Sequence, residues 1–342
     1  MTKFERYVGM LKGHEVDFVP RIPIVMQYAA EYIGSNYGAF ASDYAVLVEA
    51  NCRCAQDFGF EQLSSISDPY RETHAFGGQV TYVQDGVPRC TSPLENTNDV
   101  STLLHPDPRT SVRMADRVKA ISEYKRLFSN DSSILGWVEG PAAEAADLRG
   151  VTRFLMDTIE DREFLARLMD LCLDVGIDFA KAQIRAGADT IGIGDAIASQ
   201  LSPDTYESLI QPREKALVRA IHEAGSFVRL HICGNITHLF PGIADLGVDI
   251  LDVDHMVDVT HARRVVGDKV AIGCNINPVD GVMLGTPASI HDYVKRTYQA
   301  VGNPFMVSAG CEIPHGTPPE NLRALCEPIP YSIWLKEVDR RN

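Results

Sequence analysis

From about residue 130 onward, short apolar, β-branched runs alternate with longer stretches of helical periodicity. The apolar runs predict strands over residues 133–140, 189–195, 226–234, 249–256, 269–276 and 304–313. The stretches between them predict helices over residues 161–186, 203–225, 237–246, 258–266 and 288–301. Two of these helices begin with capping groups, at Ser202-Pro203 and Thr286-Pro287. This alternation indicates parallel strands joined by right-handed crossovers.

The first third of the chain adds two strands and one helix. Residues 18–26 and 62–67 predict strands, and residues 41–57 predict a helix. Between residues 76 and 93, the Asp85-Gly86 pair lies between apolar runs and predicts a β-hairpin insertion.

Eight predicted strands favour an α/β fold of the (β/α)8 TIM-barrel class, with an open doubly wound sheet as the alternative. No linker or internal repeat divides the sequence, so we expect residues 1–342 to form a single barrel domain. Gly192-Ile193-Gly194 lacks the third glycine of a dinucleotide-binding loop, and we interpret it as a crowded strand end.

Composition and charge exclude several classes of function. The formal net charge of −14 argues against nucleic-acid binding, which requires clustered Lys and Arg. The sequence has neither the apolar stretch of a secretory signal nor a run of about 18 apolar residues, so we expect no membrane span. The eight cysteines are scattered through a long chain, which is typical of reduced thiols in a cytoplasmic protein.

Polar residues that can titrate or bind a metal ion gather where the predicted strands end. They are Asp68, Glu139, Asp195, His231, Cys233, Asp254, His255, Cys274, Asn275 and Cys311. In a barrel of this class, the carboxyl ends of the strands and their loops form the active-site face. The distribution therefore predicts an enzyme.

A zinc site is predicted from three of these residues. Residues two apart in a strand project to the same face, so His231 and Cys233 both point into the barrel mouth. Zinc binds imidazole and thiolate together, and Cys311 supplies a third ligand from a later strand end. Three protein ligands leave a coordination position open, which is typical of catalytic zinc. Cys274 competes for the same role, whereas Cys52 and Cys54 lie in a helical pattern where their side chains diverge.

With these residues, the sequence resembles the uroporphyrinogen decarboxylase superfamily, from VDFVPRIPI near the start to SAGCEIPHGTPPENLRAL near the end. Within it, His231, Cys233 and Cys311 match the His-x-Cys and distant Cys of the zinc-dependent corrinoid methyltransferase branch. That branch includes coenzyme M methyltransferases, chloromethane enzymes and O-demethylase components. GWVEGPAAEAADLRG (136–150) and DAIASQLSPDTYESLIQP (195–212) are also similar to it.

Two departures disfavour uroporphyrinogen decarboxylation. Decarboxylases carry an arginine-rich stretch for the porphyrin carboxylates, but residues 24–34 read IVMQYAAEYIG. Their GHG-type ending reads Ala309-Gly310-Cys311 in this chain, with a zinc-suited thiol in place of histidine.

The resemblance implies transfer of a methyl group between a small substrate and the cobalt of a corrinoid. The first interpretation is an O-demethylase methyltransferase component that takes an O-methyl compound such as an aryl methyl ether. The alternative is a methylcobamide:thiol methyltransferase of the coenzyme M type, and a non-catalytic corrinoid binder is a third. No Asp-x-His-x-x-Gly motif is present, so a partner protein is expected to present the corrinoid. The oligomeric state is left open, a homodimer included.

Three carboxylates are candidates for catalytic roles. Glu139 and Asp195 could orient the substrate or protonate a leaving group. Asp254 could be a fourth zinc ligand or the outer-shell partner that orients His231.

Four further residues are candidates for substrate binding. Asp68 and Tyr70 could line the substrate pocket. His255 follows a strand end, and Asn275 could hold a polar group of the substrate.

Overall fold

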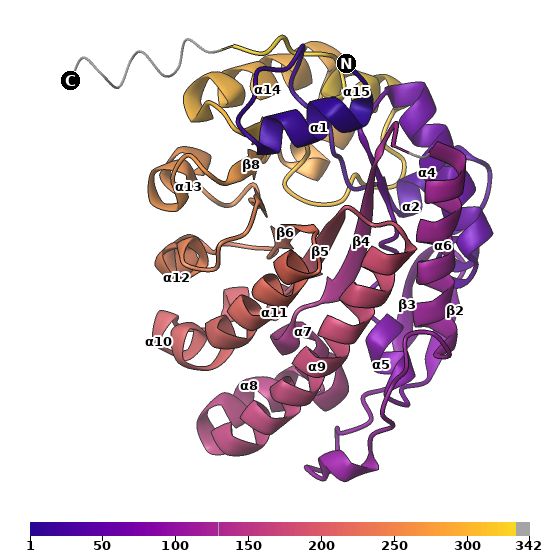
Figure 1. The fold of residues 1–342 in the computed structure, drawn as a ribbon, viewed down its shortest axis with the longest axis vertical. Coiled ribbons are helices and arrows are strands. Elements are labelled where there is room, and N and C mark those ends of the chain that lie inside the picture. Colours follow the sequence, from indigo (N-terminus) through magenta and orange to yellow (C-terminus); the bar gives the residue numbers. More distant parts are fainter. Residues whose placement is uncertain (129, 333–342) are drawn as a thin grey trace.

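Parallel strands joined by helices form the centre of the protein in a computed structural model, which describes residues 1–128 and 130–332 (Figure 1). Among these residues, seven strands make one curled sheet in the order β1-β4-β5-β6-β7-β8-β9. Their bounds are β1 (Gln62–Ser64), β4 (Ser133–Glu139), β5 (Thr190–Gly194), β6 (Phe227–His231), β7 (Ile250–Asp252), β8 (Ala271–Gly273) and β9 (Phe305–Met306). Spatial order follows chain order, as in a (β/α) barrel.

An extended segment near the start of the chain closes the barrel between β9 and β1. Arg21 forms a parallel bridge with Val307, whose N–H donates to Pro20 O at 2.7 Å. On the other side, the Glu61 N–H donates to Arg21 O at 2.8 Å. Residues 18–26 were predicted as a regular strand but form only isolated bridges, because Pro20 and Pro23 have no N–H to donate.

The helices lie outside the sheet, with α6, α9 and α11 side by side in Figure 1. Their bounds are α1 (Lys3–Leu11), α2 (Gln27–Tyr32), α3 (Tyr37–Ser42), α4 (Tyr44–Phe58), α5 (Arg71–Ala75), α6 (Val112–Phe128), α7 (Pro141–Arg149), α8 (Val151–Glu160), α9 (Arg162–Ala186), α10 (Pro203–Thr205), α11 (Gln211–Glu223), α12 (Phe240–Ala244), α13 (Val259–Val266), α14 (Pro287–Val301) and α15 (Pro319–Leu325). The helix predicted over 203–225 is interrupted by a π-helical turn, Tyr206–Ile210, just before Pro212. The helix predicted over 41–57 is divided at Asp43, whose carboxylate caps α4.

The predicted hairpin is present as β2 (Val80–Val83) and β3 (Gly86–Cys90), which pair antiparallel. Its turn consists of Gln84 and Asp85, one position earlier than the sequence pattern indicated. Gln84 O accepts the Gly38 N–H at 3.1 Å, which fixes the hairpin against α3.

Part of the barrel interior is lined by apolar side chains. Ile24, Ile66, Leu135 and Trp137 form a small apolar cluster. A Cβ on Gly192 would lie 2.2 Å from the Trp137 ring, so this glycine is required by the indole and not by a nucleotide. The prediction of a crowded strand end is therefore confirmed.

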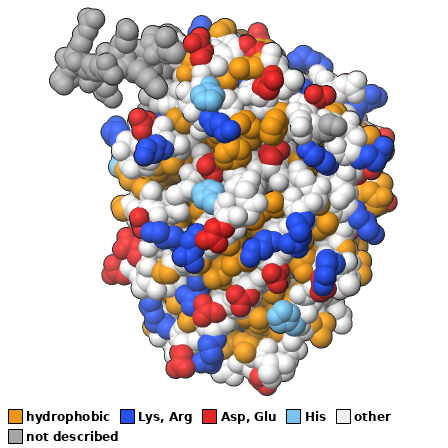
Figure 2. Space-filling model, viewed as in Figure 1, with side chains coloured by type: hydrophobic (Ala, Val, Ile, Leu, Met, Phe, Trp, Pro, Cys, Tyr) orange, Lys and Arg blue, Asp and Glu red, His pale blue; other side chains and the backbone are white. Residues whose placement is uncertain are grey.

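The surface mixes charges and apolar groups. Figure 2 shows acidic and basic side chains interspersed with apolar ones over the face in view. No helix within the described ranges, 1–128 and 130–332, is both long and apolar enough to span a bilayer.

Candidate functional site

His231, Cys233 and Cys311 converge at the carboxyl ends of the strands. His231 is the last residue of β6, Cys233 follows two positions later, and Cys311 lies beyond β9. His231 Nε2 is 3.1 Å from Cys233 Sγ and 3.7 Å from Cys311 Sγ, and the two sulfurs are 3.7 Å apart. Within the described part of the chain, this His-Cys-Cys triad is the one set of three or more His, Cys, Asp or Glu residues whose ligand atoms all lie within 4.8 Å.

The donor set fits a zinc ion. A tetrahedral centre with Zn–S bonds of about 2.3 Å places its two sulfurs about 3.8 Å apart and each sulfur about 3.5 Å from the imidazole nitrogen. The sulfur–sulfur separation of 3.7 Å matches this geometry, and the nitrogen–sulfur separations of 3.1 and 3.7 Å bracket the second value. Three protein ligands leave a fourth position for a substrate atom.

The two thiols differ in their readiness to ionise. A hydrogen bond from Cys233 lowers the pKa of Cys311 to about 4, and the neighbouring His231 acts in the same direction. The same hydrogen bond and burial raise the pKa of Cys233. The surroundings of Cys311 therefore favour its thiolate, which is the form that binds metals.

Asp252 orients the histidine. Its Oδ2 lies 3.0 Å from His231 Nδ1, which leaves Nε2 facing the two sulfurs. Arg229 Nε donates to the same oxygen at 2.8 Å, and Arg229 Nη1 donates across the barrel to Gln62 Oε1 at 2.8 Å. A carboxylate on the second ring nitrogen is the usual support of a metal-binding histidine.

Asp254, which the sequence suggested for this role, holds a loop instead of contacting His231. Its Oδ2 accepts the Gly234 N–H at 2.9 Å and its Oδ1 accepts the Met256 N–H at 3.0 Å. His255 Nδ1 lies 2.9 Å from Asp254 Oδ1. The β6–β7 register pairs His231 with Asp252, so Asp254 lies beyond the histidine along β7.

A cavity of about 180 Å³, here called the site cavity, opens beside the triad. Its other lining residues are Ile24, Met26, Ile66, Asp68, Pro69, Trp137, Glu139, Gly194, Ala196 and Glu312. The sequence analysis named Asp68 and Glu139 but missed Trp137 and Glu312. Trp137 lies two positions before Glu139 on β4 and so shares its face, and Glu312 follows Cys311 directly. Both could have been found from these spacings.

Two of the carboxylates that line the cavity form ion pairs with buried arginines. Arg113 binds Asp68 through Nη1 at 2.8 Å and Nη2 at 2.6 Å. Burial acts to raise the pKa of Asp68, but the Arg113 guanidinium outweighs it and holds the pKa well below its usual range. Arg71 Nη2 donates to Glu139 Oε1 at 2.6 Å. Even so, burial, reinforced by Glu72, raises the pKa of Glu139 well above its usual range.

A third carboxyl group, that of Glu312, also lines the site cavity. Its Oε1 accepts the Gln27 N–H at 2.9 Å. Burial raises the pKa of Glu312 to about 7, and the adjacent Cys311 contributes.

The remaining predicted residues lie outside the lining of the site cavity. Asp195 is buried and its Oδ1 accepts the Ala143 N–H at 2.7 Å, at the start of α7. Tyr70 donates its backbone N–H to Asp68 Oδ1 at 3.1 Å. Asn275 donates from Nδ2 to Val257 O at 2.9 Å. Cys274, the competing ligand, is buried and lies outside the triad.

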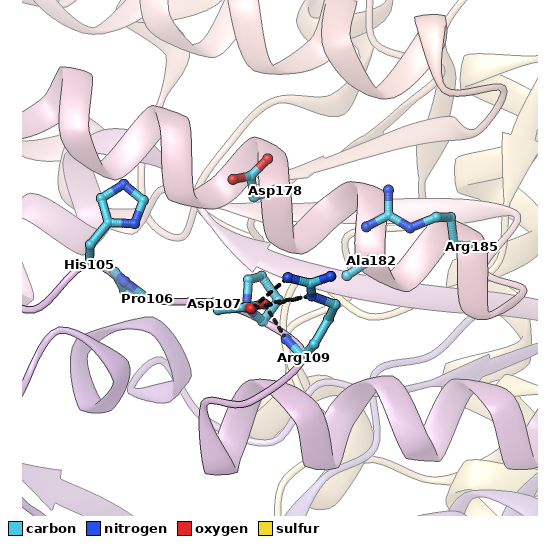
Figure 3. Close-up of a pocket in the computed structure, with 8 residues that line it drawn as sticks. His105, Pro106, Asp107, Arg109, Asp178, Ala182 and Arg185 are labelled. Carbon is cyan, nitrogen blue, oxygen red and sulfur yellow. Dashed lines mark hydrogen bonds and ion pairs between the residues drawn. The ribbon is translucent and has the colours of Figure 1, made fainter.

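A larger cavity, of about 340 Å³, lies on the outside of the protein between residues 105–109 and helix α9 (Figure 3). Arg109 Nη2 donates to Asp107 Oδ2 at 2.8 Å, so these two charges satisfy each other. The described residues that line this cavity include one histidine, His105, and no cysteine. Of these two cavities, the smaller site cavity is therefore the one whose lining residues are suited to binding a metal ion.

Fold and site together define a (β/α) barrel with a His-Cys-Cys triad, a suitable set of metal ligands, at the carboxyl ends of its strands. Residues 2–329 match the family model described as Uroporphyrinogen decarboxylase (URO-D), and the chain belongs to that family.

Similar proteins lie in two groups within the family. The chain is 30% identical to the methylcobamide:CoM methyltransferase MtaA of Methanosarcina barkeri, over 94% of this chain and 95% of the relative. It is 26% identical to a uroporphyrinogen decarboxylase of Prochlorococcus marinus (strain MIT 9312), over 70% of each chain. A solved methyltransferase from Methanosarcina mazei shares the fold with a TM-score of 0.87 and 24% identity, over 95% of this chain and 97% of that one.

Proposed function

We propose that the protein is a zinc- and corrinoid-dependent methyltransferase that moves a methyl group from the cobalt of a corrinoid to a thiol. The observation that carries the proposal is the convergence of His231, Cys233 and Cys311 beside the site cavity. The Methanosarcina barkeri relative, named for methyl transfer from a methylcobamide to CoM, supports it over nearly the full length of both chains. A separate corrinoid protein presents the methyl group, and the free cysteines suit a reducing cytoplasm.

The comparisons favour a thiol acceptor over an aryl methyl ether donor. The sequence analysis preferred the O-demethylase component and kept the thiol reaction as its alternative. None of the relatives described above is named for O-demethylation, whereas the one with the higher identity is named for a CoM reaction. We therefore adopt the thiol reaction.

Uroporphyrinogen decarboxylation is poorly supported by the charges of the site. A substrate with many carboxylates requires cations, but none of the described residues that line the site cavity is Lys or Arg. Asp68, Glu139 and Glu312 line it instead. The decarboxylase relative also matches a smaller share of the chain than the methyltransferase does.

The chain's own residues prepare the acceptor for an in-line displacement. The triad would hold zinc, which supplies Lewis acidity that keeps a coordinated substrate thiol ionised near neutral pH. Asp252 fixes the orientation of His231, and the apolar wall of Ile24, Ile66 and Trp137 limits water around the sulfur. A thiolate held in this way would attack the methyl carbon, so that the sulfur–carbon bond forms as the carbon–cobalt bond of a bound methylcorrinoid breaks. The electron pair of the broken bond would remain with cobalt, and the thiol proton would pass to solvent.

The proposal is tested in two stages. We expect about one zinc per chain in the wild type, a clear loss in Cys311→Ser, and no change in the control Cys52→Ser, a half-buried cysteine of α4. The wild type is then mixed with methylcobalamin and 2-mercaptoethanol, and the visible spectrum is followed over time. We expect progressive demethylation that Cys311→Ser lacks while its circular dichroism remains native. Zinc-free wild-type protein, or a spectrum that changes on mixing but does not progress, would overturn the proposal.

A further inference from the structure

Among the residues that the structure describes, those that line the site cavity include no Lys or Arg that could bind an anion. Of the described residues that line it, three carry carboxyl groups and none carries a basic side chain other than the ligand His231. Ile24, Met26 and Trp137 supply apolar walls. A sulfonate or carboxylate on a small substrate usually meets arginine, lysine or a helix N-terminus, because its charge must be compensated once water is removed.

The nearest arginines are already neutralised. Arg71 is fully buried and Arg113 is 4% exposed. Arg113 makes its two-pronged contact with Asp68, and Arg71 binds Glu139. In both pairs the carboxylate residue lines the cavity and the arginine does not. These guanidinium groups therefore position acidic side chains and are closed to a substrate anion.

The metal centre adds no attraction for an anion. Two cysteine thiolates balance the charge of a zinc ion, and the histidine ligand is neutral. A third sulfur ligand from the substrate would make the centre negative, which favours a positive charge nearby. Glu312 and Trp137 both line the same cavity, and a carboxylate and an aromatic ring each attract an ammonium group.

We propose that the acceptor is a small thiol whose far end is uncharged or cationic, with an aminoalkyl thiol favoured over a sulfonate. This inference rests on the proposed function, because it names the class of thiol that the same site accepts. The ammonium end lies toward Glu312, and the connecting carbons pack against Trp137. The methyl-transfer step is the same for every thiol: sulfur–carbon bond formed, cobalt–carbon bond broken, electron pair left on cobalt and proton released to solvent.

Three thiols with the same two-carbon chain isolate the effect of charge. Cysteamine, 2-mercaptoethanol and 2-mercaptoethanesulfonate are each assayed with methylcobalamin and the zinc-loaded wild type, with rates referred to the thiolate concentration. We expect kcat/KM to fall in that order, with the sulfonate at least ~10-fold below the amine, because the described lining of the cavity offers a sulfonate no Lys or Arg and includes the carboxyl group of Glu312. A sulfonate that reacts as well as the amine would overturn the inference.

Binding of the methylated products gives a readout that does not depend on turnover. The S-methyl derivatives of the three thiols are titrated into the protein by calorimetry, and we expect the same order of affinity. If none of the thiols demethylates methylcobalamin, the proposed function fails, but this titration still decides which charge the cavity accepts. Equal or tighter binding of the sulfonate derivative would overturn the inference on its own.

A charge reversal at the cavity wall supplies the matched variant. Glu312→Lys is expected to shift the ratio of sulfonate to amine kcat/KM at least ~10-fold toward the sulfonate. Glu320→Lys makes the same change of net charge at an exposed site on α15 and is expected to leave the ratio unchanged. Zinc content and circular dichroism are measured for both. If Glu312→Lys loses zinc or fold, Glu312→Gln replaces it and must weaken the binding of the S-methyl amine. No shift in a folded, zinc-loaded variant would refute the assignment of Glu312.

Discussion

Replacing Asp252 with asparagine tests whether this carboxylate holds His231, the proposed zinc ligand, in place. Asp252 Oδ2 receives both Arg229 Nε at 2.8 Å and His231 Nδ1 at 3.0 Å, whereas Oδ1 has no hydrogen-bond partner in the described structure. An amide oxygen can replace Oδ2 without a steric change, but it lacks the charge. A hydrogen bond to a charged group contributes about 1.5–3 kcal/mol, so we expect zinc affinity to fall about 10- to 100-fold in Asp252→Asn.

The assay is competition for zinc with a chromogenic chelator, combined with urea unfolding of the metal-free proteins. We expect Asp252→Asn to fold with a loss of about 1–3 kcal/mol, because its buried NH₂ group replaces the unpartnered oxygen. Asp254→Asn is the matched control. Asp254 lies two residues after Asp252 in the sequence, and its carboxylate binds backbone N–H groups and not His231. Unchanged zinc affinity in Asp252→Asn, or a larger loss in Asp254→Asn, would refute the assignment of Asp252.

Three further perturbations test the packing and the charges around the site. Gly192→Ala places a Cβ 2.2 Å from the Trp137 ring, and we expect a loss of about 1–3 kcal/mol in urea unfolding. Burial raises the pKa of Asp147 to about 7, so the wild type loses stability as pH rises from about 4 toward 7, and Asp147→Asn should gain stability relative to wild type at pH ~8 but not at pH ~4. Arg113→Gln leaves Asp68 buried without its cation, and we expect a cost of about 3–5 kcal/mol at neutral pH. Because Arg113 lowers the pKa of Asp68, this deficit should shrink as the pH falls below about 4, and a deficit that stays constant in acid would contradict the pairing.

The convergence of His231, Cys233 and Cys311 could be predicted from sequence because strand geometry alone decides the direction of their side chains. Residues two apart on a strand share a face, which brought His231 and Cys233 together, and barrel topology brought Cys311 to the same end. The order of strands followed from the alternation of elements in the same way. These features depend on local periodicity, which a single sequence contains.

The supporting residues depend on register, which a single sequence does not contain. Asp252 and Asp254 would share a face of the predicted strand over 249–256, and only the pairing of His231 with Asp252 decides which carboxylate reaches the imidazole. Asp195 ends its strand as predicted, but the start of α7 comes close enough to take its carboxylate as a cap. The arginines behind Asp68 and Glu139 come from α5 and α6, and nothing in the spacing of the sequence links them to those carboxylates.

The segment that closes the barrel has a consequence for how the chain folds during its synthesis. Arg21 and its neighbours are synthesised before both of their partners, and Glu61 follows after a short stretch of chain. Their other neighbour, Val307, lies far later in the sequence, so one side of the segment stays unpaired until that part of the chain has been made. Pro20 and Pro23 cannot donate hydrogen bonds, which makes the waiting edge a poor template for pairing with another nascent chain. The prolines that prevent a regular strand in the finished barrel therefore protect the unfinished one from aggregation.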